Sequence, residues 1–338
     1  MKQRTSVRNV VMSGNKYTVV STFAGCGGSS LGYKLAEFHE LLAIDFDENA
    51  VETFRLNFPE VPVWLRDITT VSAQEILEFT GLKVGELDVF DGSPPCQGFS
   101  TAGRRKINDP RNRLFEAYVD LIKGLQPKVF VMENVSGMVK GKMRGTFKEI
   151  LRTLKSCGYI VKVKLLNAKY YQVPQSRQRL FFIGVREDIG IEPTFPLPNL
   201  KVIPVKDVIA EFIDVPYPEL APRGMNDTLW DLLRPGEQGS AVYPNKYFNH
   251  VKISWHKPCP TITKSVGLSY TCLMHPYRKR LLSIDEIKRL ASFPDDFQFV
   301  GKFEDQWARI GNAVMPKMME AVARSIKKNV LDVYYGRA

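Results

Sequence analysis

The chain has 338 residues, of which 44% are hydrophobic and 25% charged, a balance typical of a globular protein with one large or two modest domains. No apolar run reaches the length that crosses a bilayer, and no signal-peptide core follows the basic first residues, so we expect a cytoplasmic protein without membrane association. The formal net charge of +11 favours a polyanionic partner such as nucleic acid.

The cysteines argue against two kinds of small-protein scaffold. There are 5 of them, widely spaced and without a CxxC pair, and the 4 histidines are scattered. This pattern predicts neither a disulfide framework nor a structural zinc site. We therefore expect reduced thiols and no bound metal.

The first half of the chain alternates short apolar runs with amphipathic stretches. The runs predict strands at 17–23, 41–44, 87–90, 129–132 and 180–185. Helical spacing of apolar residues occupies 47–57, 113–123 and 146–156. Strands that alternate with helices predict an α/β fold with a doubly wound, mostly parallel sheet covered on both faces.

The character of the chain changes near residue 187. Prolines and aromatic residues are frequent from there to 277, with little periodic pattern, and helical spacing returns at 283–293 and 317–329. We predict a second, smaller and irregular domain over 187–299, with its variable part at 187–277. The larger domain would combine residues 1–186 with 300–338, and its final helix would return to pack on the sheet.

A glycine-rich turn follows the first predicted strand. Such a turn between a strand and a helix lets a ligand approach the backbone closely. Counting from Gly25, Ser30 stands where the dinucleotide fingerprint needs its third glycine, so that fingerprint fails. Asp45 follows the second strand, where an acid can bind ribose hydroxyls, and Asp47 could serve instead or begin a helix. The pattern favours an adenosine-type cofactor, with Asp67 as an adenine contact or a helix cap.

Chemistry-bearing side chains follow two further predicted strands. Cys96 stands behind Pro94 and Pro95, whose fixed φ angles make a stiff turn that presents a nucleophile; a buried packing thiol is the alternative. Glu133 follows the next strand, where open α/β sheets bind ligands, unless it is a solvated loop acid. A thiol and a carboxyl in one pocket suit covalent catalysis on a heterocycle.

Two arginines precede the last strand of this domain. Arg177 and Arg179 are two residues apart, so on an extended segment they share a face. They could place two guanidinium groups on a phosphate or a base edge, or form a plain basic edge.

In this order the motifs resemble those of the DNA cytosine carbon-5 methyltransferases of bacterial restriction–modification systems. The similar segments are FAGCGG at 23–28, SPPCQGFS at 93–100, ENV at 133–135, QSRQR at 175–179, residues 280–295 and QWARIGNAVMP at 306–316. They span nearly the whole chain, with the variable segment in its place. Asp45 is a small departure, because the family often has glutamate there.

The resemblance implies a Rossmann-like methyltransferase fold with a target-recognition domain, and a mechanism. Cys96 would add to carbon 6 of a flipped-out cytosine, Glu133 would hold the base, and Arg179 supported by Arg177 would hold its carbonyl oxygen and Glu133. S-adenosylmethionine would supply the methyl group and leave as S-adenosylhomocysteine. The implied cofactor site comprises Phe23, Ala24, Gly25, Gly27, Asp45, Phe46, Asp67, Ile68, Pro95, Leu114, Asn312 and Val314.

The resemblance also implies how DNA is held. The basic run at 103–113 resembles a mobile loop that closes over DNA, although a charge run by itself is usually a solvated loop. The expected DNA contacts are Ser100, Arg104, Arg105, Lys106, Arg111 and Thr261. Recognition would lie in the variable part, where base and phosphate candidates include Lys246, Lys252, Lys257, Lys264, Tyr243, Tyr247, Trp255 and Tyr270.

These observations predict a monomeric enzyme that methylates a short specific sequence of double-stranded DNA, paired with a restriction endonuclease. An RNA cytosine methyltransferase is the alternative within the enzyme class, against which the separate recognition domain argues. A non-catalytic DNA-binding regulator is the alternative outside it, against which the intact Cys96, Glu133 and Arg179 argue.

Overall fold

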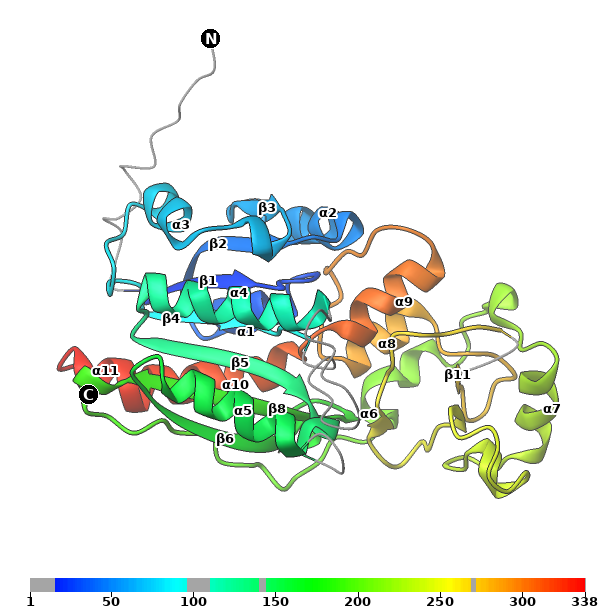
Figure 1. The fold of residues 1–338 in the computed structure, drawn as a ribbon. Coiled ribbons are helices and arrows are strands. Elements are labelled where there is room, and N and C mark those ends of the chain that lie inside the picture. The colour runs from blue at the N-terminus through cyan, green and yellow to red at the C-terminus, as the bar shows by residue number, and fades with distance from the viewer. Residues whose placement is uncertain (1–15, 96–109, 140–143, 269–271, 338) are drawn as a thin grey trace, which may run out of the picture.

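A computed structural model describes residues 16–95, 110–139, 144–268 and 272–337. Its larger lobe is built on one sheet of 7 strands in the order β3-β2-β1-β4-β5-β8-β6 (Figure 1). The strands are β1 (Thr18–Thr22), β2 (His39–Asp45), β3 (Val63–Leu65), β4 (Val89–Gly92), β5 (Val129–Val135), β6 (Tyr159–Asn167) and β8 (Gln178–Arg186). The first five run parallel, and β8 is antiparallel to both β5 and β6. The predicted mostly parallel sheet is confirmed.

Two strands of this sheet were missing from the sequence prediction, and both lie at an edge of the sheet. The short strand β3 extends the sheet beyond β2, and β6 closes the opposite edge. In β6 the exposed Lys162 and Lys164 interrupt the apolar pattern that marks a buried strand. Edge strands of natural sheets commonly carry lysines, which discourage pairing with other chains.

Helices cover both faces of the sheet, as a doubly wound fold requires. One hydrophobic core packs α3 (Ala73–Thr80), α4 (Pro110–Leu125) and α5 (Arg144–Lys155) against one face. A second core packs α1 (Gly28–Leu35), α2 (Glu48–Asn57) and α10 (Pro316–Ile326) against the other. Alternate residues of one strand enter opposite cores, for example Val19 and Val20 of β1.

The C-terminal helix α10 returns to the N-terminal half of the fold and packs against α1, as predicted. Gly32 of α1 permits this contact, because a Cβ there would lie 2.5 Å from the Cβ of Met319. The pair therefore approaches more closely than any side chain at position 32 would allow. A π-helical turn, Lys327–Leu331, and α11 (Asp332–Tyr334) complete the chain.

The smaller lobe has little regular structure (Figure 1, right). Its elements are α6 (Lys206–Ile209), α7 (Met225–Leu232) and the parallel pair β9 (His250–Lys252) and β11 (Cys272–Met274). Single 3₁₀ turns connect the elements of both lobes at Ile68–Thr70, Ser136–Val139, Ala168–Tyr170, Glu187–Ile189, Ala210–Phe212, Pro218–Leu220 and Gly239–Ala241. The prolines of this region explain the short elements, since each removes a backbone donor.

A strand pair and two helices connect the two lobes, in addition to the chain segments that run between them. The strand β10 (Cys259–Pro260) pairs with β7 (Gln175–Ser176), and the helices α8 (Ile284–Leu290) and α9 (Phe303–Asn312) lie between the lobes (Figure 1). Residues just after 187 still pack on the larger lobe, where Thr194 Oγ1 lies 3.1 Å from Ser325 Oγ. The division at residue 187 stays a prediction.

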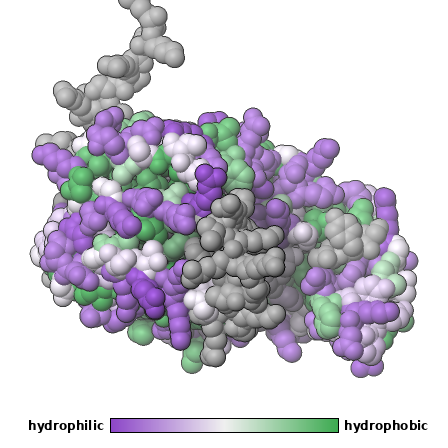
Figure 2. Space-filling view, viewed as in Figure 1, coloured by the Kyte–Doolittle hydropathy of each residue, from purple (hydrophilic) through white to green (hydrophobic). Residues whose placement is uncertain are grey.

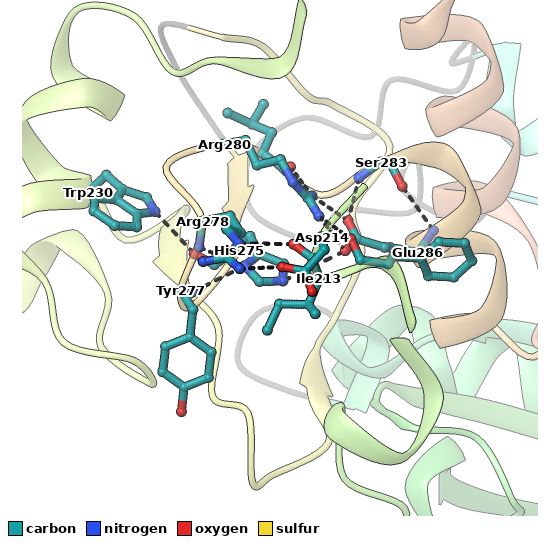
Figure 3. A network of polar contacts seen from close by, with 11 residues as sticks. Ile213, Asp214, Trp230, His275, Tyr277, Arg278, Arg280, Ser283 and Glu286 are labelled. Atoms are coloured by element: carbon teal, nitrogen blue, oxygen red, sulfur yellow. Dashed lines mark hydrogen bonds and ion pairs between the residues drawn. The ribbon is translucent and has the colours of Figure 1, made fainter. Parts of the chain in front are cut away.

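A buried ion pair holds the smaller lobe against α8 (Figure 3). Arg280 donates through both terminal nitrogens to Glu286, at 2.7 and 2.9 Å. Glu286 also accepts the Ser283 backbone N–H at 2.8 Å, which closes a capping box at the start of α8. Burial lowers the pKa of the neighbouring His275 to about 3, so this imidazole is neutral and accepts backbone N–H groups from Tyr277 and Arg278.

Hydrophilic side chains dominate the face of the molecule shown in Figure 2, and hydrophobic residues are scattered in small groups. Among the described residues, no helix combines the length and the apolar character that crossing a membrane requires.

The ion pair makes a stability prediction. We expect Glu286→Ala to lower the free energy of unfolding by about 3–5 kcal/mol, because it leaves the buried Arg280 guanidinium unpaired. Asp285→Ala is the matched control, since this neighbouring acid is exposed and its partner Lys288, 3.4 Å away, is buried but keeps its hydrogen bond to the Asp295 carbonyl oxygen. It should cost about 0–1 kcal/mol. Urea unfolding measures both, and equal small losses would contradict a structural role for the pair.

Candidate active site

A cavity of about 520 Å³ opens at the carboxyl ends of the parallel strands, the edge at which open α/β sheets bind ligands. Its walls come from the carboxyl ends of β2 and β5, from the segments that follow β1, β2 and β4, from the arginine segment, from residues 261–264, and from the end of α9 with the two residues after it. The lining comprises residues 23–26, 28–29, 45–47, 93–95, 133–135, 177, 179, 261, 263–264, 309 and 311–314. The volume lies in the range of small-molecule and cofactor sites.

The glycine-rich turn is folded so that its backbone faces this cavity. Gly25 and Gly27 have φ angles of 56° and 95°, which are favourable only for glycine. Gly28 begins α1, and a Cβ on it would lie 2.3 Å from the Val314 carbonyl oxygen. The turn therefore packs directly on the C-terminal segment that closes the cavity.

Asp45 fixes this turn from the end of β2. One carboxylate oxygen accepts the Gly25 N–H at 2.8 Å and the other accepts the Asp47 N–H at 2.9 Å. Burial raises the pKa of Asp45, and these two donors oppose that shift. Asp47 caps α2 by accepting the Ala50 N–H, and it also pairs with Arg309 at 2.8 Å. Asp45 thus has a structural role besides the predicted ribose contact.

Phe46 lines the cavity with its ring 70% exposed, so it is not a packed core residue. An apolar ring beside a hollow offers a stacking surface for a planar heterocycle.

The acid and one arginine predicted from sequence meet at the cavity. Arg179 Nε lies 2.7 Å from Glu133 Oε1, and both side chains are largely buried. Burial raises the pKa of the Glu133 carboxyl, and the charge of Arg179 opposes this rise. Asn134, the next residue, donates to the Pro94 carbonyl oxygen at 2.9 Å. This hydrogen bond joins the end of β5, which carries Glu133, to the turn that leads into Cys96.

Arg177 behaves differently from Arg179. Its guanidinium is fully buried and donates to the carbonyl oxygens of Ile262 and Gly311, both at 2.7 Å, and of Ala313 at 3.2 Å. The expectation that both arginines present one face to a phosphate or base is therefore wrong for Arg177. The cause is that Arg177 lies between β7 and β8, outside the extended strand, and turns into the core.

The structure brings most of the predicted cofactor residues to the cavity. The lining includes Phe23, Ala24, Gly25, Asp45, Phe46, Pro95, Asn312 and Val314, while Gly27, Asp67, Ile68 and Leu114 are not part of it. Asp67 Oδ1 accepts the Thr69 N–H at 2.9 Å, so the capping interpretation is confirmed. Ile68 is buried in the core, and Leu114 packs against that core.

Several predicted residues cannot be located. Cys96, Ser100, Arg104, Arg105, Lys106 and Tyr270 lie outside the described residues, as does the side chain of Arg111. Thr261 lines the cavity, and its hydroxyl donates to the Ser176 carbonyl oxygen at 2.9 Å. Lys252, a candidate for DNA contact, is instead buried and donates to the Trp230 carbonyl oxygen at 2.9 Å. Its ammonium lies 3.7 Å from the Trp230 ring centroid, a contact that the local sequence does not reveal.

Sequence reasoning missed Arg309, Thr263 and Lys264 as cavity residues. Arg309 stands inside one of the recognised motifs, and that placement was the available signal. Lys264 was expected to contact DNA and not to line this cavity. Thr263 and Lys264 reach the cavity through the β7–β10 pairing, which joins residues far apart in sequence.

Fold and cavity together define an α/β enzyme with a cofactor-sized site at the carboxyl edge of its sheet. The family model for C-5 cytosine-specific DNA methylase matches residues 17–328. Type II methyltransferase M1.HphI of Haemophilus parahaemolyticus is 36% identical, over 92% of this chain and 87% of that protein. For M.NgoPII of Neisseria gonorrhoeae the identity is 32%, over 94% of this chain and 97% of that protein.

A solved structure has the same fold. It is a prophage-encoded protein of Escherichia coli assigned as a DNA modification methyltransferase, with a TM-score of 0.76 and 23% identity, over 94% of this chain and 100% of that one. The chain belongs to the C-5 cytosine-specific DNA methylase family. It is a DNA cytosine-5 methyltransferase that uses S-adenosylmethionine.

The Glu133–Arg179 contact makes a prediction about protonation. We expect Arg179→Gln to raise the pKa of the Glu133 carboxyl further, because the larger of the two charges that oppose the effect of burial is then removed and only that of Arg177 remains. A ¹³C NMR titration of the glutamate carboxyl carbons measures it, with Glu133→Gln identifying the resonance. Arg186→Gln is the control on the same strand, since Arg186 pairs with Asp188 at the far end of β8. An unchanged or lower pKa in Arg179→Gln would refute the electrostatic coupling.

Proposed function

We propose that the chain methylates carbon 5 of one cytosine within a short, specific sequence of double-stranded DNA, through covalent addition of Cys96 to carbon 6. The observation that carries this proposal is the Glu133–Arg179 pair at 2.7 Å, held at the cavity beside the turn that leads into Cys96. A carboxyl group and a guanidinium so placed suit a flipped-out base that has both donor and acceptor edges.

The chemistry requires activation of the ring, because carbon 5 of cytosine is a weak nucleophile. The Cys96 thiolate adds to carbon 6, which makes carbon 5 enamine-like. Glu133 hydrogen-bonds ring nitrogen 3 and the exocyclic amine, and Arg179 holds both Glu133 and the base carbonyl oxygen while charge builds up. After carbon 5 takes the methyl group, loss of its proton restores the double bond and expels Cys96.

The residues of the cavity fit the cofactor. Phe46 offers its exposed ring to the adenine, the turn at Gly25 and Gly28 lets backbone approach closely, and Asp45 holds that turn in shape. S-adenosylmethionine supplies the methyl group when it is bound. Arg177 is a positioning residue here, since its three carbonyl contacts fix the segments that carry Thr261 and Asn312.

The finer organisation follows from the same assignment. We propose that residues 1–186 with 300–338 form the catalytic domain and that 187–299 form the target-recognition domain. The enzyme would act as a monomer on chromosomal DNA in a bacterial cytoplasm and would protect that DNA from a partner restriction endonuclease. The net charge of +11 supports a polyanionic substrate.

Bisulfite sequencing of plasmid DNA from cells that express the chain tests the reaction and its specificity together. We expect protected cytosines in one short sequence context, and none in the matched plasmid from cells that lack the chain. Absence of protected cytosines, with soluble protein that binds S-adenosylmethionine, would refute the proposed reaction.

Cys96→Ser tests the nucleophile. We expect turnover of tritiated cofactor on DNA to fall at least 10³-fold, while DNA and cofactor binding survive, because a serine hydroxyl is far less ionised than a thiol. Cys157→Ser is the control, since this thiol is buried in the core that contains α3, α4 and α5 and is not part of the cavity lining. Near wild-type turnover of Cys96→Ser would contradict the assignment.

Phe46→Ala tests the cofactor site. We expect the Kd for S-adenosylmethionine to rise about tenfold, because a base–aromatic stack is worth roughly 1–3 kcal/mol. Isothermal titration calorimetry measures it. Leu56→Ala serves as the control, as this side chain is exposed on α2 and is not part of the cavity lining. Equal affinities of Phe46→Ala and wild type would remove Phe46 from the cofactor site.

A further inference from the structure

A second hollow of about 240 Å³ lies on the smaller lobe, next to the catalytic cavity. The two share Thr261 and Thr263, so a ligand seated in one is adjacent to the other. The remaining lining comes from Gln238, Phe248, Asn249, Val251, Pro260, Ser265, Cys272, Leu273 and Trp307. None of these residues has a part in the proposed chemistry.

The exposed side chains of this hollow are suited to base edges. Gln238 and Asn249 are exposed amides, each of which offers a donor and an acceptor in one plane. Gln238 donates to the Ser240 hydroxyl at 2.9 Å, which orients its amide. Phe248 is 54% exposed beside them, and an apolar face of this kind can contact a thymine methyl group.

Buried contacts hold the loop that carries Phe248 and Asn249 in place. His250 Nδ1 lies 2.5 Å from Asn226 Oδ1, and Asn226 Nδ2 donates to the Gly267 carbonyl oxygen at 2.9 Å. The Tyr247 ring packs edge-on against the His250 ring, with centroids 5.2 Å apart. Because this loop is already ordered, its side chains lose little conformational entropy when a ligand binds.

The left-handed backbone of this loop supports the same conclusion. Asn245 and Tyr247 have φ angles of 64° and 56°, which non-glycine residues seldom adopt. Gly239 makes room for the turn, because a Cβ there would lie 2.4 Å from the Tyr247 Cβ. Strained backbone of this kind persists where the surrounding structure fixes it, and it occurs preferentially at functional sites.

Two lysines lie close to the hollow. Lys264 lines the catalytic cavity, and Lys246 is exposed on the loop beside Phe248. Exposed lysines of this kind contact phosphates, which positions the duplex without reading its sequence.

We propose that Gln238 and Asn249 are specificity-determining residues, which read base edges adjacent to the target cytosine. The assignment rests on the proposed function and adds the residues that distinguish one sequence from another. An amide can pair with the exposed edge of a base in the major groove, and one such contact is worth roughly 1–3 kcal/mol of discrimination. Removing either amide should therefore relax one position of the recognition sequence by about 5–150-fold.

Bisulfite sequencing of the expression host's DNA tests this with Gln238→Ala, Asn249→Ala and the control Gln298→Ala. Gln298 is an exposed amide that lies outside both hollows. We expect each test variant to methylate cytosines in contexts where one flanking base is no longer fixed, while Gln298→Ala keeps the wild-type context. Thermal melting and S-adenosylmethionine binding should match wild type in all three variants, and Asn249→Ser replaces Asn249→Ala if the latter fails to fold.

The outcomes separate this assignment from the function on which it rests. Folded variants that keep the wild-type context and the wild-type preference for it would overturn the assignment and leave the proposed function intact. A wild-type chain that methylates no cytosine would overturn both. Lys246→Ala provides a further contrast, since loss of a phosphate contact should weaken binding evenly across sequences and flatten its salt dependence.

Discussion

The buried guanidinium of Arg177 is the interaction on which the arrangement of the active site depends. It comes from the segment between β7 and β8 and binds backbone carbonyl oxygens of Ile262, Gly311 and Ala313. The segments that contain Arg177, Ile262 and residues 311–313 are far apart in sequence, and the hydrogen bonds of this one guanidinium connect them. Separating these segments in the folded protein would leave a buried guanidinium without hydrogen-bond partners, which costs free energy, so the three segments stay together.

Glu133, the proposed catalytic acid, shows the electrostatic cost of such a site. Glu133 lies at the end of a buried strand, where removal from water raises its pKa, and Arg179 limits that rise from 2.7 Å away. Nearby, burial raises the pKa of Asp91 to about 8, although Tyr33 donates to it at 3.2 Å. Buried carboxyl groups with raised pKa values are common at functional sites, because catalytic groups are often placed in buried clefts.

The two lobes hold their side chains in place by different means. The larger lobe fixes its residues on the ends of parallel strands, so Glu133 and Pro94 keep their places through the sheet itself. The smaller lobe has few regular elements and relies on particular buried contacts, such as Arg280 with Glu286 and His250 with Asn226. Such a lobe can change its exposed loops while its anchors remain, which suits a surface that differs from one recognition sequence to the next.

The sequence by itself determined the alternation of strands and helices, the glycine-rich turn, the Glu133 position and the family, because each depends on local periodicity or on a contiguous motif. It also predicted a proline-rich, irregular second region, whose boundary at residue 187 stays a prediction. The local pattern did not separate Arg177 from Arg179, although the family resemblance gave Arg177 the supporting role, since two residues of one short segment look alike until the fold turns one of them into the core. Two other outcomes needed the tertiary structure: Lys252 is buried over Trp230, and Arg309 and Thr263 reach the cavity. Those outcomes depend on contacts between residues far apart in the chain, which local patterns do not encode.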